Sequence, residues 1–225
     1  KSVFRNNHAS GQSGFGGAIN IVGTESISIQ DFSGDNNSPE AFGGVQISQT
    51  GSVVNIARST ISNNRAEGAA TSVTGGIGIA DYNALVMLNS TISGNQSQSS
   101  RGGISLAPRS SAVGGQGGRL TNVTITNNRS GLGVAGANGG GLTLVNTDAP
   151  TALYNTIVAE NFTGIGAISD NISGLVSAAL STNNLIGSGG NGGLIHGVNN
   201  NQVNMDYAGL FPLASNYGRT QTHAL

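Results

Sequence analysis

The stretch Ser90-Thr91-Ile92-Ser93-Gly94-Asn95, followed by Gly102-Gly103-Ile104-Ser105-Leu106, contains the pattern that decides the fold of this chain. An apolar residue stands three positions before Asn or Asp, and this pair recurs at intervals of 28 to 33 residues. The copies are Phe4/Asn7, Phe32/Asp35, Ile61/Asn64, Ile92/Asn95, Ile125/Asn128 and Val158/Asn161. Self-similarity at such a period indicates a stack of equivalent units.

A second motif runs in phase with the first. Glycine, followed by Gly or Ala, precedes two aliphatic residues that alternate with one further residue, and this period of two predicts a half-buried strand. The copies begin at Gly17, Gly43, Gly75, Gly102 and Gly140. A third motif, such as Met87–Ile92 or Leu120–Ile125, has apolar ends five residues apart with Ser, Thr and Asn between them. Each unit therefore contains two short strands joined by variable loops.

Strands this short, without any helical periodicity, do not form crossover units with helices. Winding each unit into one coil pairs its strands in parallel with the coils above and below, and stacks the aliphatic side chains in a column. We predict an all-β fold, a right-handed parallel β-helix (solenoid) of about six to seven coils. An antiparallel sandwich is the main alternative, but it would show hairpin turns.

The recurring polar residues have a structural role in this prediction. One amide per coil, at the same corner, forms a hydrogen-bonded ladder along the axis, and Asn tolerates the left-handed backbone of a sharp corner. The paired glycines allow similar backbone angles and close approach between coils. The predicted ladder consists of Asn7, Asp35, Asn64, Asn95, Asn128 and Asn161. The predicted structural glycines are Gly17, Gly43, Gly75, Gly102 and Gly140.

One domain is predicted, because no linker interrupts the period. Residues 1–186 form the coils, and residues 187–225 form a C-terminal loop and capping segment of the same domain, in which residues 206–225 cover the final coil. The chain opens inside a repeat, so we expect it to be part of a longer polypeptide or of an assembly.

Composition narrows the possible settings. Charged residues make up 8% of the chain and the formal net charge is −1, which argues against nucleic acid as a partner. The chain has no cysteine, and no apolar run long enough to span a membrane. Solubility must then come from Asn, Ser, Thr and Gly.

No catalytic or metal-binding motif stands out, and no cofactor is predicted. His8, His196 and His223 lack a second histidine at ligand spacing. Asp81 and Asp148 follow equivalent strands two coils apart, a separation compatible with the carboxylate pair of an inverting glycosidase, with Arg109 between them. Both lie among ordinary turn residues, and we predict no catalytic residue. A functional surface is expected in the variable loops, residues 66–74, 107–118 and 130–139.

Three parts of the chain resemble known families. The residues Phe4-Arg5-Asn6-Asn7, followed by Gly16-Gly17-Ala18-Ile19, resemble the paired repeats of polymorphic outer-membrane proteins, which are surface autotransporter adhesins. The coils at residues 59–64 and 90–95 resemble repeats of large secreted bacterial β-helix proteins. From about residue 153, the motifs Asp170–Gly174, Asn184–Gly187, Asp206–Leu213 and Thr220–Leu225 resemble choice-of-anchor Q domain proteins. Tyr207, Tyr217 and Arg219 depart from that pattern, which usually has Pro, Gly and Pro there.

The resemblance implies a secreted or cell-surface protein, extracellular or on the outer membrane of a bacterium. Two hypotheses follow from different classes. The first is a non-catalytic, adhesin-like structural or binding module, whose partners are a surface polysaccharide or other surface proteins. The second is a polysaccharide lyase or glycoside hydrolase on the same fold, or a non-catalytic fragment of one, which requires acidic side chains that meet in a groove.

Overall fold

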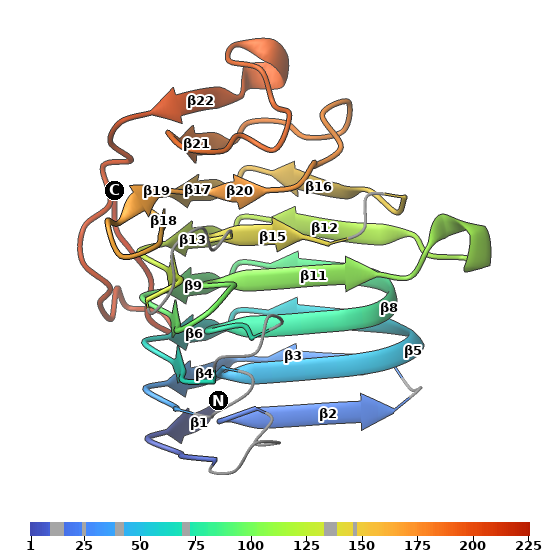
Figure 1. The fold of residues 1–225 in the computed structure, drawn as a ribbon, viewed down its shortest axis with the longest axis vertical. Coiled ribbons are helices and arrows are strands. Elements are labelled where there is room, and N and C mark those ends of the chain that lie inside the picture. Colours follow the sequence, from blue (N-terminus) through green and yellow to red (C-terminus); the bar gives the residue numbers. More distant parts are fainter. Residues whose placement is uncertain (10–15, 24–25, 39–42, 69–72, 133–138, 146–147) are drawn as a thin grey trace.

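The computed structural model describes residues 1–9, 16–23, 26–38, 43–68, 73–132, 139–145 and 148–225 (Figure 1). These residues form an all-β fold in which the strands stack as a parallel β-solenoid, and this confirms the predicted fold class. The two short 3₁₀ helices of the described chain are η1 (Ser111–Val113) and η2 (Val198–Asn200).

An eight-stranded parallel sheet runs the whole height of the solenoid. Its register partners lie about one repeat apart in sequence, as in the pairs Ser33 with Thr60 and Thr91 with Thr124. The chain completes about five turns from β1 to β17, and β21 and β22 then extend the sheet. In spatial order the strands are β1 (Ser2–Arg5), β4 (Phe32–Asp35), β6 (Thr60–Ser62), β9 (Thr91–Ser93), β13 (Thr124–Thr126), β17 (Ile157–Ala159), β21 (Leu185–Gly187) and β22 (Gln202–Met205).

A second, larger sheet covers two sides of the solenoid because β5 (Val45–Ala57) and β8 (Ile77–Leu88) bend around a corner. Their first halves belong to the front face in Figure 1 and their second halves to the back. The other front strands are β2 (Ile19–Gly23), β11 (Ile104–Pro108), β15 (Leu142–Leu144) and β20 (Ile172–Ser173). The other back strands are β3 (Ile27–Gln30), β12 (Gly117–Thr121) and β16 (Thr151–Tyr154).

A third, narrow sheet follows the ladder corner. Its strands are β7 (Arg65–Ala66), β10 (Gln96–Ser97), β14 (Arg129–Ser130), β18 (Phe162–Thr163) and β19 (Ile168–Ser169). Pairing is parallel except between β18 and β19, which are antiparallel.

The inward side chains of these sheets form one continuous apolar column. Ile61, Ile92, Ile125 and Val158 are each at most 1% exposed, and they come from the predicted apolar positions of successive coils. The aliphatics after the glycine pairs, such as Ile79 and Leu106, are equally buried and pack in the same cluster. The period-two alternation of the sequence is therefore the source of the core.

The predicted glycines permit close approach between coils. A methyl group added at Gly75 would lie 2.6 Å from the carbonyl oxygen of Gly102, and one at Gly43 would collide with the carbonyl of Gly75. None of Gly43, Gly75, Gly102 and Gly140 has a positive φ, so the prediction of left-handed angles at these glycines is wrong. Glycine is required at these positions because the backbone of the next coil occupies the space that a side chain would need.

The C-terminal segment, residues 206–225, runs along the side of the solenoid and does not cap the final coil as predicted (Figure 1). It crosses the outer face of the eight-stranded sheet, where the Thr60 hydroxyl donates to the carbonyl oxygen of Gln221 (2.6 Å) and His223 Nε2 lies 2.9 Å from Ser93 Oγ. Outward-facing Thr60, Ser62 and Thr126 are consequently fully buried. The coils also continue past residue 186, because β22 pairs with β21.

Candidate functional site

A ladder of asparagines, buried except at Asn7, runs up one corner of the solenoid. Each side-chain Nδ2 donates to the Oδ1 of the next asparagine at 2.8–3.0 Å. Asn95 shows the full pattern, because its Oδ1 accepts from the Asn64 amide and its Nδ2 also donates to the Ile61 carbonyl. The members are Asn7, Asn37, Asn64, Asn95, Asn128, Asn161 and Asn171. These amides are committed to the scaffold, so the ladder is not a ligand site.

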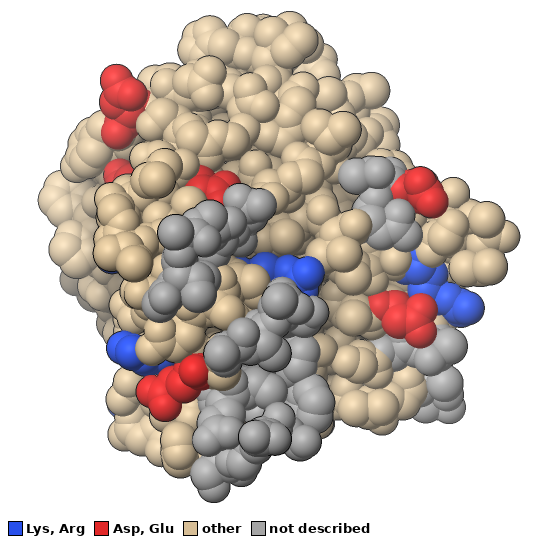
Figure 2. Space-filling model, viewed as in Figure 1, with Lys and Arg blue, Asp and Glu red and all other residues tan. Residues whose placement is uncertain are grey.

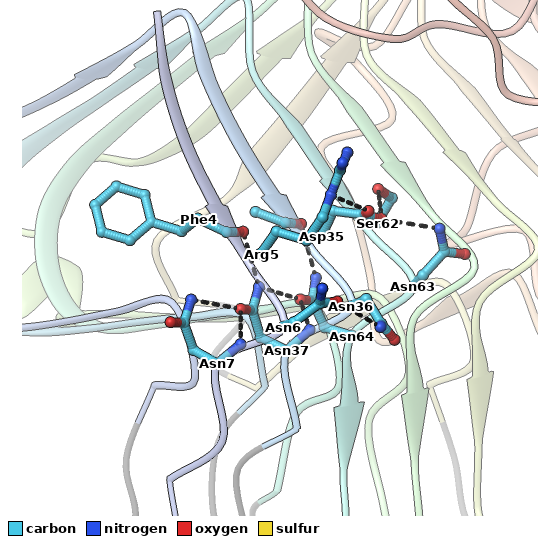
Figure 3. A network of polar contacts seen from close by, with 11 residues as sticks. Phe4, Arg5, Asn6, Asn7, Asp35, Asn36, Asn37, Ser62, Asn63 and Asn64 are labelled. Carbon is cyan, nitrogen blue, oxygen red and sulfur yellow. Dashed lines mark hydrogen bonds and ion pairs between the residues drawn. The ribbon is translucent and has the colours of Figure 1, made fainter.

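The structure corrects one ladder residue, because Asn37 occupies the place predicted for Asp35. Gly34 is the register partner of Ile61, and the Phe32 ring lies over Gly34, where an inward side chain would otherwise stand. The apolar position of this coil is thus displaced by two residues. Asp35 lies on the outside and accepts hydrogen bonds from Arg5, Ser62 and Asn63 at 2.9–3.0 Å (Figure 3).

The left-handed corner residue is the one before each ladder amide, not the ladder amide itself as predicted. Asn6, Asn36, Asn63 and Asn127 all have φ between 54° and 58°. Two coils replace this Asn with Gly94 or Glu160, which also have positive φ. Two neighbouring residues therefore have separate roles at this corner. The ladder residue places its side chain inside the solenoid, and the residue before it adopts the left-handed backbone conformation that turns the chain.

A second column of asparagines lies on the outside, at the corner between the back strands and the eight-stranded sheet. Asn155 Nδ2 donates to Asn122 Oδ1 at 2.7 Å, and Asn122 Nδ2 donates to Asn89 Oδ1 at 2.9 Å. Higher up, Asn200 Nδ2 donates to Asn183 Oδ1 at 3.2 Å. All five residues are exposed and have positive φ. Each carboxamide can make about four hydrogen bonds, so this outer column retains capacity that the inner ladder lacks.

This outer column borders a groove of about 670 Å³. Thr124, Ile157, Leu185 and Gln202, from four successive strands of the eight-stranded sheet, line it together with the C-terminal residue Leu225. The other lining residues are Asn122, Val123, Asn155, Thr156, Asn183, Asn184 and Asn200. No charged side chain lines this groove. The asparagine column and the neighbouring sheet residues thus run side by side along the axis, and each repeats at the spacing of the coils, about 4.8 Å.

Several acidic residues of the described chain are paired with arginines. Asp81 lies 3.5 Å from Arg109 Nε, which belongs to the coil between Asp81 and Asp148. Asp31 accepts from Arg58 at 2.8 Å and from Arg219 of the C-terminal segment at 3.2 Å. The Arg58 hydrogen bond holds the pKa of Asp31 below its ordinary value of 3.8, against the opposing effect of desolvation. These pairs hold coils together.

A small hollow of about 70 Å³ brings Glu160 and Asp206 to one lining, together with Ser169 and Ser188. Sequence reasoning did not pair these two acids. The hollow is well below the several hundred Å³ of ordinary ligand pockets, and Glu160 Oε1 already accepts from the Ala208 amide at 3.4 Å. It serves to anchor the start of the C-terminal segment.

The three histidines make separate local contacts. His8 Nδ1 forms a hydrogen bond with Ser38, and His196 Nδ1 forms one with the Val203 backbone. His223 forms hydrogen bonds with both Phe211 and Ser93. Within the described ranges, no three His, Cys, Asp or Glu side chains are grouped so as to hold a metal ion. Of the loops expected to carry function, residues 69–72 and 133–138 lie outside the described residues, and residues 107–118 contain η1.

Sequence reasoning missed the outer asparagine column, although its signal was present. Asn89, Asn122 and Asn155 each stand six residues before a ladder asparagine. The motif was visible as part of the strand repeat, but only the structure shows that its side chains point outward beside a groove. The contribution of Leu225 could not be foreseen, because it depends on the path of the C-terminal segment.

Compared with known proteins, the chain matches no family model, no curated sequence and no solved structure. In the part of the chain that the structure describes, no helix is long and apolar enough to cross a membrane.

Proposed function

We propose that this chain is a non-catalytic module of the cell surface or extracellular space that binds a neutral surface polysaccharide in the groove beside the outer asparagine column. The extracellular setting rests on the low charge, the polar uncharged surface and the resemblance to bacterial surface β-helix proteins. The alternative partners, other surface proteins, remain an outcome of the binding test below.

The observation that carries this proposal is the groove itself. Its lining offers carboxamides and hydroxyls but no charged side chain, which suits a ligand rich in neutral hydroxyl groups. Asn155 Oδ1 has no hydrogen bond from any described residue, so it can accept one from a ligand. Four coils contribute in register, which favours an extended polymer parallel to the axis over a compact molecule.

The proposal is tested by affinity electrophoresis in neutral polysaccharides, followed by calorimetric titration with cellotetraose, mannotetraose and xylotetraose. The variant Asn155→Gly removes one amide while keeping the positive φ of 47°. We expect it to weaken binding about threefold to tenfold, the value of one or two neutral hydrogen bonds.

The matched control is Asn127→Gly, which removes another exposed asparagine with positive φ, 57°, at the opposite corner. Its affinity should equal that of the wild type. Equal losses in both variants, or no binding of any neutral oligosaccharide, would overturn the proposal. Capture of a surface protein that Asn155→Gly does not weaken would also count against it.

The lyase or hydrolase alternative predicts turnover. It is tested by incubating the protein with pectic, alginate and neutral polysaccharides and measuring new reducing ends and unsaturated products. Appearance of either product, lost in Glu160→Gln or in Asp81→Asn, would replace the binding proposal with an enzyme.

A further inference from the structure

The outer face of the eight-stranded sheet carries one column of register partners that is covered at its lower end and open at its upper end. In order up the solenoid, its members are Thr60, Thr91, Thr124, Ile157, Leu185 and Gln202. Thr60 and Thr91 are at most 3% exposed. The other four line the groove beside the outer asparagine column. This groove is therefore the open part of a longer surface.

The C-terminal segment, residues 206–225, covers the lower part of this surface (Figure 1). The Thr60 hydroxyl donates to the Gln221 carbonyl oxygen at 2.6 Å, and His223 Nε2 lies 2.9 Å from Ser93 Oγ. Leu225 of the same segment lines the groove, so the covered part and the open part meet at this residue. A stretch of peptide thus occupies the lower continuation of the groove.

The segment is held mainly by polar contacts. Among the described residues, no side chain from 209 to 225 is buried, and none belongs to the apolar core. Besides the two hydrogen bonds above, Arg219 pairs with Asp31 at 3.2 Å and the Ala208 amide donates to Glu160 at 3.4 Å. A region with few buried apolar contacts opens at a low cost in free energy. The segment can therefore leave the sheet while the coils stay folded.

One hydroxyl beneath the segment lacks a partner. Thr126 is the register partner of Ser93 on one side and of Ala159 on the other, so it lies between the attachments of the segment at Ser93 and at Glu160. Its Oγ1 is fully buried and forms no hydrogen bond with any described residue. Because an unpaired buried hydroxyl is destabilising, the covered state is not the best one available to this surface.

We propose that the C-terminal segment is a displaceable cover, and that a long neutral polysaccharide replaces it and runs from the groove down to Thr60. This inference rests on the proposed function and adds the regulation of the same groove. The hydroxyls of Thr60, Ser93 and Thr126 then bind sugar hydroxyls. A neutral ligand suits this surface, since Figure 2 shows charged atoms only as small separate groups on a mostly uncharged surface.

The cover makes affinity depend on the length of the ligand. A short oligosaccharide fills the open groove, whereas a longer one gains the lower hydroxyls only in molecules whose segment is detached. Its apparent affinity is therefore reduced by the fraction of molecules in that state. By reciprocity, a long ligand must favour detachment of the segment. From Thr124 to Thr60 the covered column adds about 10 Å, two coil spacings.

The first test uses the wild-type chain with cello-, manno- and xylo-oligosaccharides of four and of six units. Hydrogen exchange of the Ala214 and Thr222 amides, which pair with each other's carbonyls inside the segment, reports its detachment. We expect a saturating hexaose to speed this exchange at least threefold, and the corresponding tetraose to leave it unchanged.

The second test loosens the cover with His223→Ala. In calorimetric titrations, the ratio of hexaose affinity to tetraose affinity should rise about threefold to tenfold, the value of one hydrogen bond that no longer holds the segment. Adding Thr126→Val to this variant should lower hexaose affinity about threefold and leave tetraose affinity unchanged, although it removes no hydrogen bond of the covered state. His8→Ala is the matched control, because His8 bonds to Ser38, and it should keep the wild-type ratio.

A thermal melt of each variant shows that the coils remain folded. Binding of a tetraose with unchanged exchange under the hexaose, or with the wild-type affinity ratio in His223→Ala, would overturn this inference and leave the proposed function standing. Absence of binding by every neutral oligosaccharide would overturn both.

Discussion

At the scale of single residues, each of three coils carries two asparagines six positions apart with different roles. The inner one belongs to the ladder and stabilises the fold, and the outer one has hydrogen-bonding groups available to a ligand. Asn95 is fully buried and satisfies four groups, namely the Asn64 amide N–H, Asn64 Nδ2, the Ile61 carbonyl and Asn128 Oδ1. Asn89 is exposed, and among the described residues its side chain accepts a hydrogen bond from Asn122 alone. The position of a carboxamide in the coil, rather than its chemistry, decides whether it stabilises the fold or can meet a ligand.

Replacement of Asn95 by Ala should lower the free energy of unfolding by about 2–4 kcal/mol, because several buried polar groups lose their partners. Urea denaturation followed by circular dichroism measures this. Asn89→Gly, which keeps the positive φ of 48°, should cost about 1 kcal/mol or less. Similar losses for the two variants would contradict the division into structural and available columns.

The sequence predicted the ladder at five of its positions, because an apolar residue and an asparagine kept a fixed spacing in each. It failed at Asp35, where Gly34 took the inward position and the Phe32 ring filled the space, so the true ladder residue is Asn37. It also missed Asn171, which follows Asn161 by 10 residues because the chain turns back through β18 and β19. Spacing alone cannot show such local substitutions of one side chain for another.

At the scale of elements, the C-terminal segment is the least predictable part of the molecule. Its motifs were visible, but its route along the eight-stranded sheet depends on contacts with coils more than a hundred residues earlier, such as Thr60 and Ser93. Repeat patterns contain no information on such contacts. The segment buries outward hydroxyls of the sheet and supplies Leu225 to the groove, so the candidate site depends on it.

His223 should hold this segment in place. Its Nδ1 lies 2.6 Å from the Phe211 carbonyl, so Nδ1–H donates there and Nε2 accepts from the Ser93 hydroxyl. We expect His223→Ala to speed hydrogen exchange of the Ala214 and Thr222 amides about tenfold, the equivalent of one hydrogen bond. His8→Ala removes a histidine whose hydrogen-bond partner among the described residues is Ser38, far from this segment, and should leave those rates unchanged. Unchanged rates in His223→Ala would show that the segment is held elsewhere.

Acid should weaken the attachment of the same segment through Asp31, which pairs with both Arg58 and Arg219. The pKa of Asp31 is lowered in the folded state, chiefly by the Arg58 hydrogen bond. Its stabilising contribution is therefore complete above the unfolded value near 4 and is lost as the pH falls through the lower folded value. Melting temperatures measured from pH 2 to pH 6 should depend less on pH in Asp31→Asn than in the wild type. An identical acid dependence would contradict this role.

At the scale of the whole molecule, the register of the coils can be tested by cross-linking, since the chain has no cysteine. Leu88 and Thr121 are parallel register partners on β8 and β12, whereas Leu88 and Arg119 are two residues out of register on the same face. Partners about 4.8 Å apart accept a disulfide, but a Cα separation of about 8 Å does not. Leu88→Cys with Thr121→Cys should oxidise completely, and Leu88→Cys with Arg119→Cys should not. The reverse result would exclude this register.

The central claim is that the outer asparagine column, and not the inner ladder, meets the ligand. Its most direct measurement is nuclear magnetic resonance of the side-chain amides in ¹⁵N-labelled protein during titration with cellotetraose, mannotetraose and xylotetraose. We predict that one of these sugars shifts the amide signals of Asn122, Asn155 and Asn183 and leaves those of Asn64, Asn95 and Asn128 unchanged. No shift in the outer column with any of the three sugars, or shifts confined to other parts of the surface, would contradict the account.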